Sequence, residues 1–304
     1  MLRMRTIYAG SAIAAANYYT RYLTDSPGEV PGVWSGEQAG ELGLAGDVDG
    51  AELLALLEGR DPINGTRLGR PFEDRYLANG KRVRAVAGFD LTFSAPKSVS
   101  ALWALTQDER ILMAHDRAVA AAMAHGERFG STTRVRAGNG RLHPDTQGLM
   151  IASFRQTTSR SDDPQLHTHA VISSKVRTDD ERWLALDARY LKQHQRQIGG
   201  LYQSVLRAEL SHELGVAWGP IVEGQAEIAG VPVELRELLS KRSEQIEVAI
   251  QAKVAEFRDR QGRGPNQWEL GALKREAAGD TRGPKSGNGV AELVTRWAAE
   301  AATI

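Results

Sequence analysis

The stretch from Gly148 to Ser174, GLMIASFRQTTSRSDDPQLHTHAVISS, decides the fold. Side chains alternate with the two-residue period of β-strands on both sides of a polar loop at residues 157–164. In the second strand this period places His167 and His169 on one face. Two imidazoles at i and i+2 lie close enough to share one divalent cation. If the strands pair antiparallel across the loop, we expect Arg155 and Gln156 near the rim where the imidazoles sit.

A His-x-His pair alone is weak evidence for a metal site, because most such pairs are ordinary polar residues on a strand. The longer pattern is more specific. Residues 159–160 (SR) followed by residues 163–171 (DPQLHTHAV) closely resemble the metal-binding motif of conjugative DNA relaxases of the TrwC/TraI (MOB-F) type. These relaxases belong to the wider class of HUH nicking endonucleases. The resemblance implies that His167 and His169 are metal ligands.

The chain departs from the family pattern at Gln156, where many members have a third histidine. A glutamine carbonyl oxygen binds hard cations, which suits magnesium or manganese better than zinc. Related HUH nickases use glutamine or glutamate as the third ligand. We therefore expect a metal site of His167, His169 and Gln156 that holds Mg²⁺ or Mn²⁺. The alternative is a weakened site in a protein that still binds DNA but nicks it poorly.

The N-terminal region carries the candidate nucleophile. Ser11 is a suitable N-cap for an alanine-rich helix predicted to run to about Leu23, and this helix carries Tyr18 and Tyr19. Without context the tyrosines are aromatic packing residues, but a phenol can also attack a phosphodiester. In the relaxases the nucleophile comes from an N-terminal tyrosine pair, and the resemblance assigns that role to Tyr18, with Tyr19 as the substitute. Many relaxases carry a second pair downstream, whereas only Tyr22 follows closely here.

Residues 88–100 (GFDLTFSAPKSVS) form the second close match and predict a strand followed by a helix capped by Ser94. Asp90 is an acid within an apolar strand, which is costly unless it is paired. Its role is either a structural hydrogen bond or, as the resemblance implies, orienting a metal-ligating histidine or helping to take the tyrosine proton. Lys97 near the helix N-terminus either contacts a phosphate or belongs to a solvated first turn.

Composition describes an ordinary soluble protein, with 41% apolar and 25% charged residues, and its 38 basic and 38 acidic residues cancel. Local charge is more informative, because residues 60–84 are basic and loop-rich and form a candidate DNA-contacting connection. We also expect Arg155 and Arg160 to neutralise phosphate charge. The chain has no cysteine, which favours the reducing cytoplasm. No apolar run approaches ~18 residues, so we expect no membrane insertion.

The resemblance covers nearly the whole chain and implies an α+β fold: a central antiparallel sheet of palm-like topology with packed helices. It implies a relaxase catalytic domain at residues 1–240. Residues 241–304 are then a C-terminal helical extension that closes over DNA and leads toward a helicase module. The sequence contains no Gly-x-x-x-x-Gly-Lys-Ser/Thr motif, so we expect no helicase motor in it.

The function implied by the resemblance is site- and strand-specific nicking and rejoining of DNA through a 5′-phosphotyrosine intermediate, at a transfer origin during conjugation. The expected partner is single-stranded or hairpin origin DNA, together with accessory relaxosome proteins and a coupling protein. One alternative is an origin-binding module whose metal site is weakened or inactive. Another is a two-histidine metal hydrolase acting on a substrate other than DNA.

Overall fold

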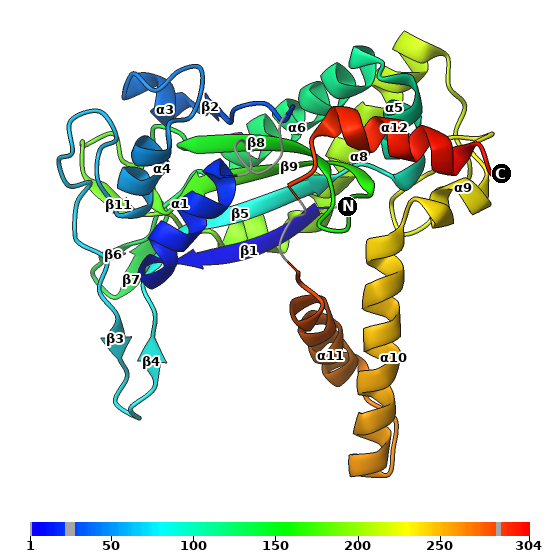
Figure 1. Ribbon diagram of the computed structural model, residues 1–304. Helices are drawn as coiled ribbons and strands as arrows, with labels where there is room; N and C mark the ends of the chain where they lie inside the picture. Colours follow the sequence, from blue (N-terminus) through cyan, green and yellow to red (C-terminus); the bar gives the residue numbers. More distant parts are fainter. Residues whose placement is uncertain (1, 22–27, 284–286) are drawn as a thin grey trace.

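A five-stranded antiparallel sheet forms the centre of the protein, with strand order β1-β5-β9-β8-β2 (Figure 1). The structure is a computed structural model that describes residues 2–21, 28–283 and 287–304. The sheet strands are β1 (Leu2–Tyr8), β5 (Val86–Ser94), β9 (Pro164–Ser173), β8 (Ile151–Thr158) and β2 (Val33–Ser35). The histidine strand β9 is therefore the middle strand, and the expected α+β fold with a central antiparallel sheet is confirmed.

The strands β8 and β9 pair as the two-residue period predicts. Their connection is a tight turn at residues 159–163, and Gln156 lies opposite His167 in the register. Three short hairpins are attached to the sheet: β3 (Arg75–Tyr76) with β4 (Arg82–Val83), β6 (Val135–Ala137) with β7 (Gly140–Leu142), and β10 (Lys175–Arg177) with β11 (Trp183–Ala185). The first of these projects away from the body of the protein (Figure 1).

Helices cover the two faces of the sheet unequally. One face packs on α5 (Lys97–Thr106), α6 (Glu109–Gly130) and α8 (Gln195–Leu214) in a large apolar core. The other face packs on α1 (Ala12–Thr20) and α4 (Gly50–Leu57) in a smaller core. The remaining short helices are η1 (Ala9–Ser11), α3 (Glu37–Glu41), α7 (Arg189–Gln193) and α9 (Val233–Leu238). The smaller core covers only part of its face, and the histidines lie on that side.

The C-terminal region leaves the body and then returns to it. The helix α10 (Lys241–Gln261) extends away, and the chain reverses at Gly262, whose positive φ of 67° favours glycine. The next helix, α11 (Gln267–Asp280), packs back along α10 (Figure 1). The last helix, α12 (Val290–Ala301), contacts α5 and α9, and its Trp297 is fully buried in the large core.

Two local expectations are corrected, and one strand was not anticipated. The residues Leu2–Tyr8 form the strand β1, which the alternating pattern of LRMRTIY could have indicated. The helix α1 does start after Ser11, but the Ser11 hydroxyl bonds to the Tyr8 carbonyl oxygen rather than capping the helix. The expected Ser94 cap is also wrong, because Ser94 is the last residue of β5 and Pro96 takes the N-cap position of α5. The end predicted for the first helix, like Tyr22, lies outside the described residues.

No helix in the described part of the chain combines the length and the apolar character needed to cross a membrane.

Candidate functional site

Two adjacent rows of side chains across β8, β9 and β5 form the candidate site. The register places Gln156, His167 and Ser94 in one row and Phe154, His169 and Thr92 in the next. Directly opposed residues in an antiparallel sheet point to the same face. The two imidazole rings are accordingly close, with centroids 5.2 Å apart.

Both histidines are held in one tautomer. The Nδ1 atom of His169 lies 2.9 Å and 3.0 Å from the two carboxylate oxygens of Asp90. The Nδ1 atom of His167 lies 2.8 Å from the backbone carbonyl oxygen of Gln165. These oxygen partners only accept hydrogen bonds, so each Nδ1 carries a hydrogen, and in the neutral imidazole the lone pair is then on Nε2. Both Nε2 atoms are therefore in the form that binds a metal ion.

The donor set fits a divalent cation. Gln156 is 2% exposed and lies opposite His167 in the register, so its side chain shares the face of both imidazoles and its amide oxygen is the candidate third donor. In the described ranges, no group of three His, Asp or Glu side chains is arranged to hold a metal ion. Two imidazole nitrogens with an amide oxygen would form a mixed nitrogen and oxygen set of the kind that binds divalent cations.

Asp90 is the centre of a buried network behind the histidines. It accepts hydrogen bonds from His169, from the Thr92 hydroxyl at 3.2 Å and from the Tyr19 phenol. Burial alone would raise the pKa of Asp90, but the charge and hydrogen bond of His169, with the hydrogen bonds of Tyr19 and Thr92, lower that pKa below its usual value. Asp90 is thus ionised and paired, and it orients the His169 ring.

The two tyrosines differ sharply in environment. Tyr19 is buried, its ring stacks on Phe154 at 5.3 Å, and its phenol bonds to Asp90. Burial and the nearby Asp90 charge raise the pKa of Tyr19 far above its usual value, which disfavours the phenolate. Tyr18 is half-buried, and its ring centroid lies 5.8 Å from that of His169. The Tyr19 ring is as near to His169, at 5.4 Å, but Tyr18 is the more accessible of the two tyrosines.

Two arginines lie against the Tyr18 ring. The guanidinium carbons of Arg160 and Arg282 are 5.3 Å and 5.2 Å from the ring centroid. Arg160 also donates a hydrogen bond to the carbonyl oxygen of Gly283 at 3.1 Å, so the segment after α11 passes beside the site. The expectation that Arg160 lies near the reacting groups is consistent with this placement, and the two cations can neutralise an anion bound there.

Two other expected DNA contacts are not brought to this face. Arg155 is opposite Thr168 in the register and therefore points to the other side of the sheet, where it pairs with Asp116 of α6. Lys97 donates a hydrogen bond to the carbonyl oxygen of Pro164 at 2.8 Å, and burial lowers the pKa of Lys97 to about 8. The expected placement of Arg155 beside the imidazoles was therefore wrong. Lys97 does not lie in a solvated first turn, because its ammonium group binds the first residue of β9.

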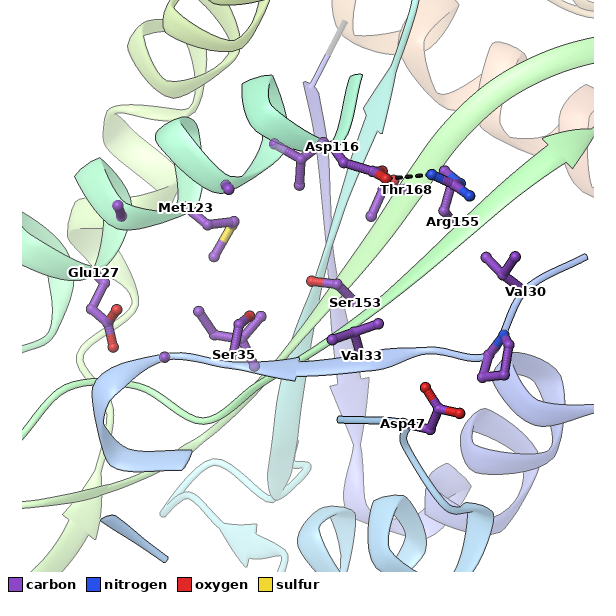
Figure 2. Close-up of a pocket in the computed structure, with 16 residues that line it drawn as sticks. Val30, Val33, Ser35, Asp47, Asp116, Met123, Glu127, Ser153, Arg155 and Thr168 are labelled. Atoms are coloured by element: carbon purple, nitrogen blue, oxygen red, sulfur yellow. Dashed lines mark hydrogen bonds and ion pairs between the residues drawn. The ribbon is translucent and has the colours of Figure 1, made fainter. Parts of the chain in front are cut away.

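Arg155 lines a separate cavity of about 590 Å³ between β2, β8 and α6 (Figure 2). Its wall is largely apolar and includes Val33, Met123 and Ile151, with Asp116 facing Arg155 across one end. Because it lies on the sheet face opposite the histidines, this cavity is not part of the candidate site.

Several residues of the site carried no clear signal in the sequence. The Thr92 hydroxyl lies 3.2 Å from His169 Nδ1. Only the position of Thr92 two residues after Asp90, on the same face of the strand, could have suggested this contact. Glu29 accepts hydrogen bonds from the Thr157 backbone nitrogen at 2.9 Å and its hydroxyl at 3.1 Å, beside Gln156. Arg282 is far from Tyr18 in the sequence, so no local pattern could place it there.

Comparisons with known proteins identify the family of this chain. The profile of the TrwC relaxase family matches residues 4–304, and the chain belongs to that family. The multifunctional conjugation protein TraI of Escherichia coli is 36% identical over 256 residues, which are 79% of this chain. The alignment spans only 14% of TraI, so the chain corresponds to about one seventh of the length of this relative.

Solved structures of the conjugative relaxase TrwC superpose over the whole chain. The metal-free complex of TrwC with oriT DNA has a TM-score of 0.81 at 32% identity, covering 100% of this chain and 98% of the other. A metal-bound complex with oriT DNA has a TM-score of 0.80 at 30% identity, with the same coverage. A TrwC complex with a 27-mer DNA, comprising the recognition hairpin and the cleavage site, has a TM-score of 0.79 at 32% identity and again the same coverage.

Proposed function

We propose that this protein nicks and rejoins one DNA strand at the transfer origin of a plasmid or integrative element during conjugation. The observation that carries the proposal is the half-buried Tyr18 beside two histidines that share one sheet face and whose Nδ1 atoms both lie within hydrogen-bond distance of acceptor oxygens. This combination supplies a nucleophile and a preformed cation site on one face of the sheet. Family membership adds the DNA substrate, because related structures contain oriT DNA.

The reaction is a transesterification. The Tyr18 phenolic oxygen attacks the phosphorus of one phosphodiester, forming an O–P bond while the bond to the 3′ oxygen breaks. The phenol loses its proton, and the leaving 3′ oxygen takes one up as a hydroxyl. The phosphate remains on Tyr18 as a 5′-phosphotyrosine, so the phosphodiester energy is conserved and the reverse attack by a 3′-hydroxyl rejoins the strand.

His167, His169 and Gln156 would hold a divalent cation, with Mg²⁺ or Mn²⁺ as the proposed ion. When bound, such an ion polarises the non-bridging phosphate oxygens and lowers the cost of charge in the transition state. Asp90 fixes the His169 ring and keeps its Nε2 available. Arg160 and Arg282 offset the phosphate charge beside Tyr18.

The proposed DNA partner is single-stranded or hairpin origin DNA. The hairpin formed by β3 and β4 projects from the body (Figure 1), and its exposed Arg75, Lys81 and Arg82 suit contact with the phosphates of a duplex stem. Accessory relaxosome proteins and a coupling protein are further proposed partners, as the resemblance implies. The proposed location is the cytoplasm. For residues 241–304, α10 and α11 form the part proposed to close over DNA.

The test is a covalent-adduct assay with single-stranded DNA from a transfer origin, labelled at its 3′ end because the 3′ fragment is the one that stays on the protein. We expect a labelled band at the protein's mass on a denaturing gel, dependent on Mg²⁺ or Mn²⁺ and lost with chelator. Tight, salt-sensitive DNA binding without an adduct would instead support an origin-binding module with an inactive metal site. Within the described part of the chain, no three His, Asp or Glu side chains are arranged to hold a metal ion together, and this favours that alternative.

The Asp90→Asn variant is expected to lower both manganese affinity and the rate of adduct formation by about 10- to 100-fold, the usual cost of losing a carboxylate partner of a metal-binding histidine. The amide group of asparagine can offer its NH₂ to His169, which favours the wrong tautomer. Calorimetric titration with Mn²⁺ and a single-turnover adduct assay measure the two effects. Asp108→Asn at the N-cap of α6 is the matched control. Unchanged manganese affinity in the Asp90 variant would limit Asp90 to a structural role.

A further inference from the structure

Two arginines of the edge strand β1 point to the same sheet face as the histidines. In the pairing of β1 with β5, Arg3 lies opposite Thr92 and Arg5 lies opposite Asp90. Thr92 and Asp90 are themselves on the histidine face, so the side chains of Arg3 and Arg5 share it. Arg3 therefore continues the row of Thr92 and His169 to the edge of the sheet. With strands ~4.8 Å apart, its backbone lies about 10 Å from that of His169.

A third arginine, in the C-terminal region, adds positive charge near this place. Arg275 of α11 is close enough to Arg3 that their positive charges interact. Figure 1 shows α11 on the β1 side of the sheet. The positive charge at this edge of the sheet thus comes from the first strand and from a helix more than 260 residues later in the chain.

These three arginines are not neutralised by the protein. Within the described residues, none of Arg3, Arg5 and Arg275 forms an ion pair with a carboxylate, whereas Arg110, Arg189 and Arg263 each do. Burial, with the charges of Arg5 and Arg275, lowers the pKa of Arg3, and Asp90 opposes this only partly. Asp90 is already engaged by His169, Thr92 and Tyr19. Like charges gathered without a counter-charge are stabilised when an anion binds between them.

We infer that Arg3 and Arg5 form a second phosphate site, which holds a backbone phosphate of the bound strand one or two nucleotides from the phosphate attacked by Tyr18. This inference rests on the proposed function, since it requires that DNA lies over the histidine face. The second site fixes the direction of the strand across the sheet. It thereby positions the scissile phosphate against Tyr18 without touching the reacting atoms.

The first experiment compares DNA binding by the Tyr18→Phe protein with and without the added pair Arg3→Gln and Arg5→Gln, by fluorescence anisotropy over a range of salt. Each phosphate contact to single-stranded DNA contributes about 0.7 to the slope of log affinity against log salt. Losing two contacts should reduce the slope by about 1.4 and weaken binding about tenfold or more near 0.1 M salt. Arg128→Gln, an exposed arginine on α6 behind the opposite face, is the matched control and should change neither quantity.

The second experiment locates the phosphate. Single uncharged methylphosphonates are placed at each position around the cleavage site. We expect one position that weakens binding of the parent protein but has no further effect in the Arg3/Arg5 variant. An unchanged salt slope, or methylphosphonate effects that add independently at every position, would overturn the second site. Absence of DNA binding and of adduct in the wild-type protein would instead defeat the proposed function, so the two failures are distinguishable.

Discussion

The Tyr18→Phe variant is expected to form no covalent DNA adduct, with a loss of at least about 1,000-fold in the adduct-forming rate, because phenylalanine has no oxygen to attack phosphorus. The substitution removes one half-buried hydroxyl and leaves the ring between Arg160 and Arg282. The fold and the binding of DNA should therefore be preserved. The measurement is the denaturing-gel assay with 3′-labelled DNA and Mn²⁺, together with anisotropy to confirm that binding persists.

Tyr19→Phe is the matched control, since it removes the neighbouring hydroxyl from the same helix. Tyr19 donates to Asp90 and its raised pKa disfavours the phenolate, so the variant should keep the adduct at a reduced rate. An adduct that survives in Tyr18→Phe but disappears in Tyr19→Phe would move the nucleophile to Tyr19. Survival in both variants would require a nucleophile elsewhere in the chain.

The part of the fold around β8 and β9 followed from the sequence because its determinants are local. A short polar loop between two alternating segments permits an antiparallel pair, and the period of two decides which side chains share a face. This reasoning put His167 and His169 together, and the structure agrees. It also explains the error at Arg155. Adjacent residues in a strand point to opposite faces, so of Arg155 and Gln156 it is Gln156 that shares the face of His167.

Other features depend on residues far apart in the sequence, and no local pattern predicts them. Arg282 and Arg160 meet at the Tyr18 ring, and Glu29 bonds to Thr157 at the end of β8. A propensity argument also failed at Ser94, a good helix cap that instead ends β5, because pairing with β9 extends the strand through that residue. Tertiary pairing outweighed local preference there.

The second large effect is expected from Trp297→Ala, which should lower the free energy of unfolding by about 3–5 kcal/mol, the usual range for removing a buried tryptophan. Trp297 is fully buried, its ring lies 6.2 Å from Trp103 of α5, and its Nε1 donates to the Asp162 carbonyl oxygen at 2.7 Å. Chemical denaturation followed by circular dichroism measures the change. Trp268→Ala is the control, because Trp268 on α11 is 87% exposed and its loss should change stability by less than about 0.5 kcal/mol.

The same variant tests whether the C-terminal helices support the histidine strand. Asp162 is held by Trp297 and Arg296, and Asp163 accepts the backbone N–H groups of Lys241 and Arg242 at 3.1 Å and 2.8 Å. This turn leads directly into β9, so loosening it should also lower manganese affinity and slow adduct formation under conditions where the protein is still folded. Reduced stability with full manganese affinity would show that α12 stabilises the core without positioning His167 and His169. Reduced manganese affinity in Trp297→Ala but not in Trp268→Ala would show that the contacts between α12 and this turn help to position His167 and His169.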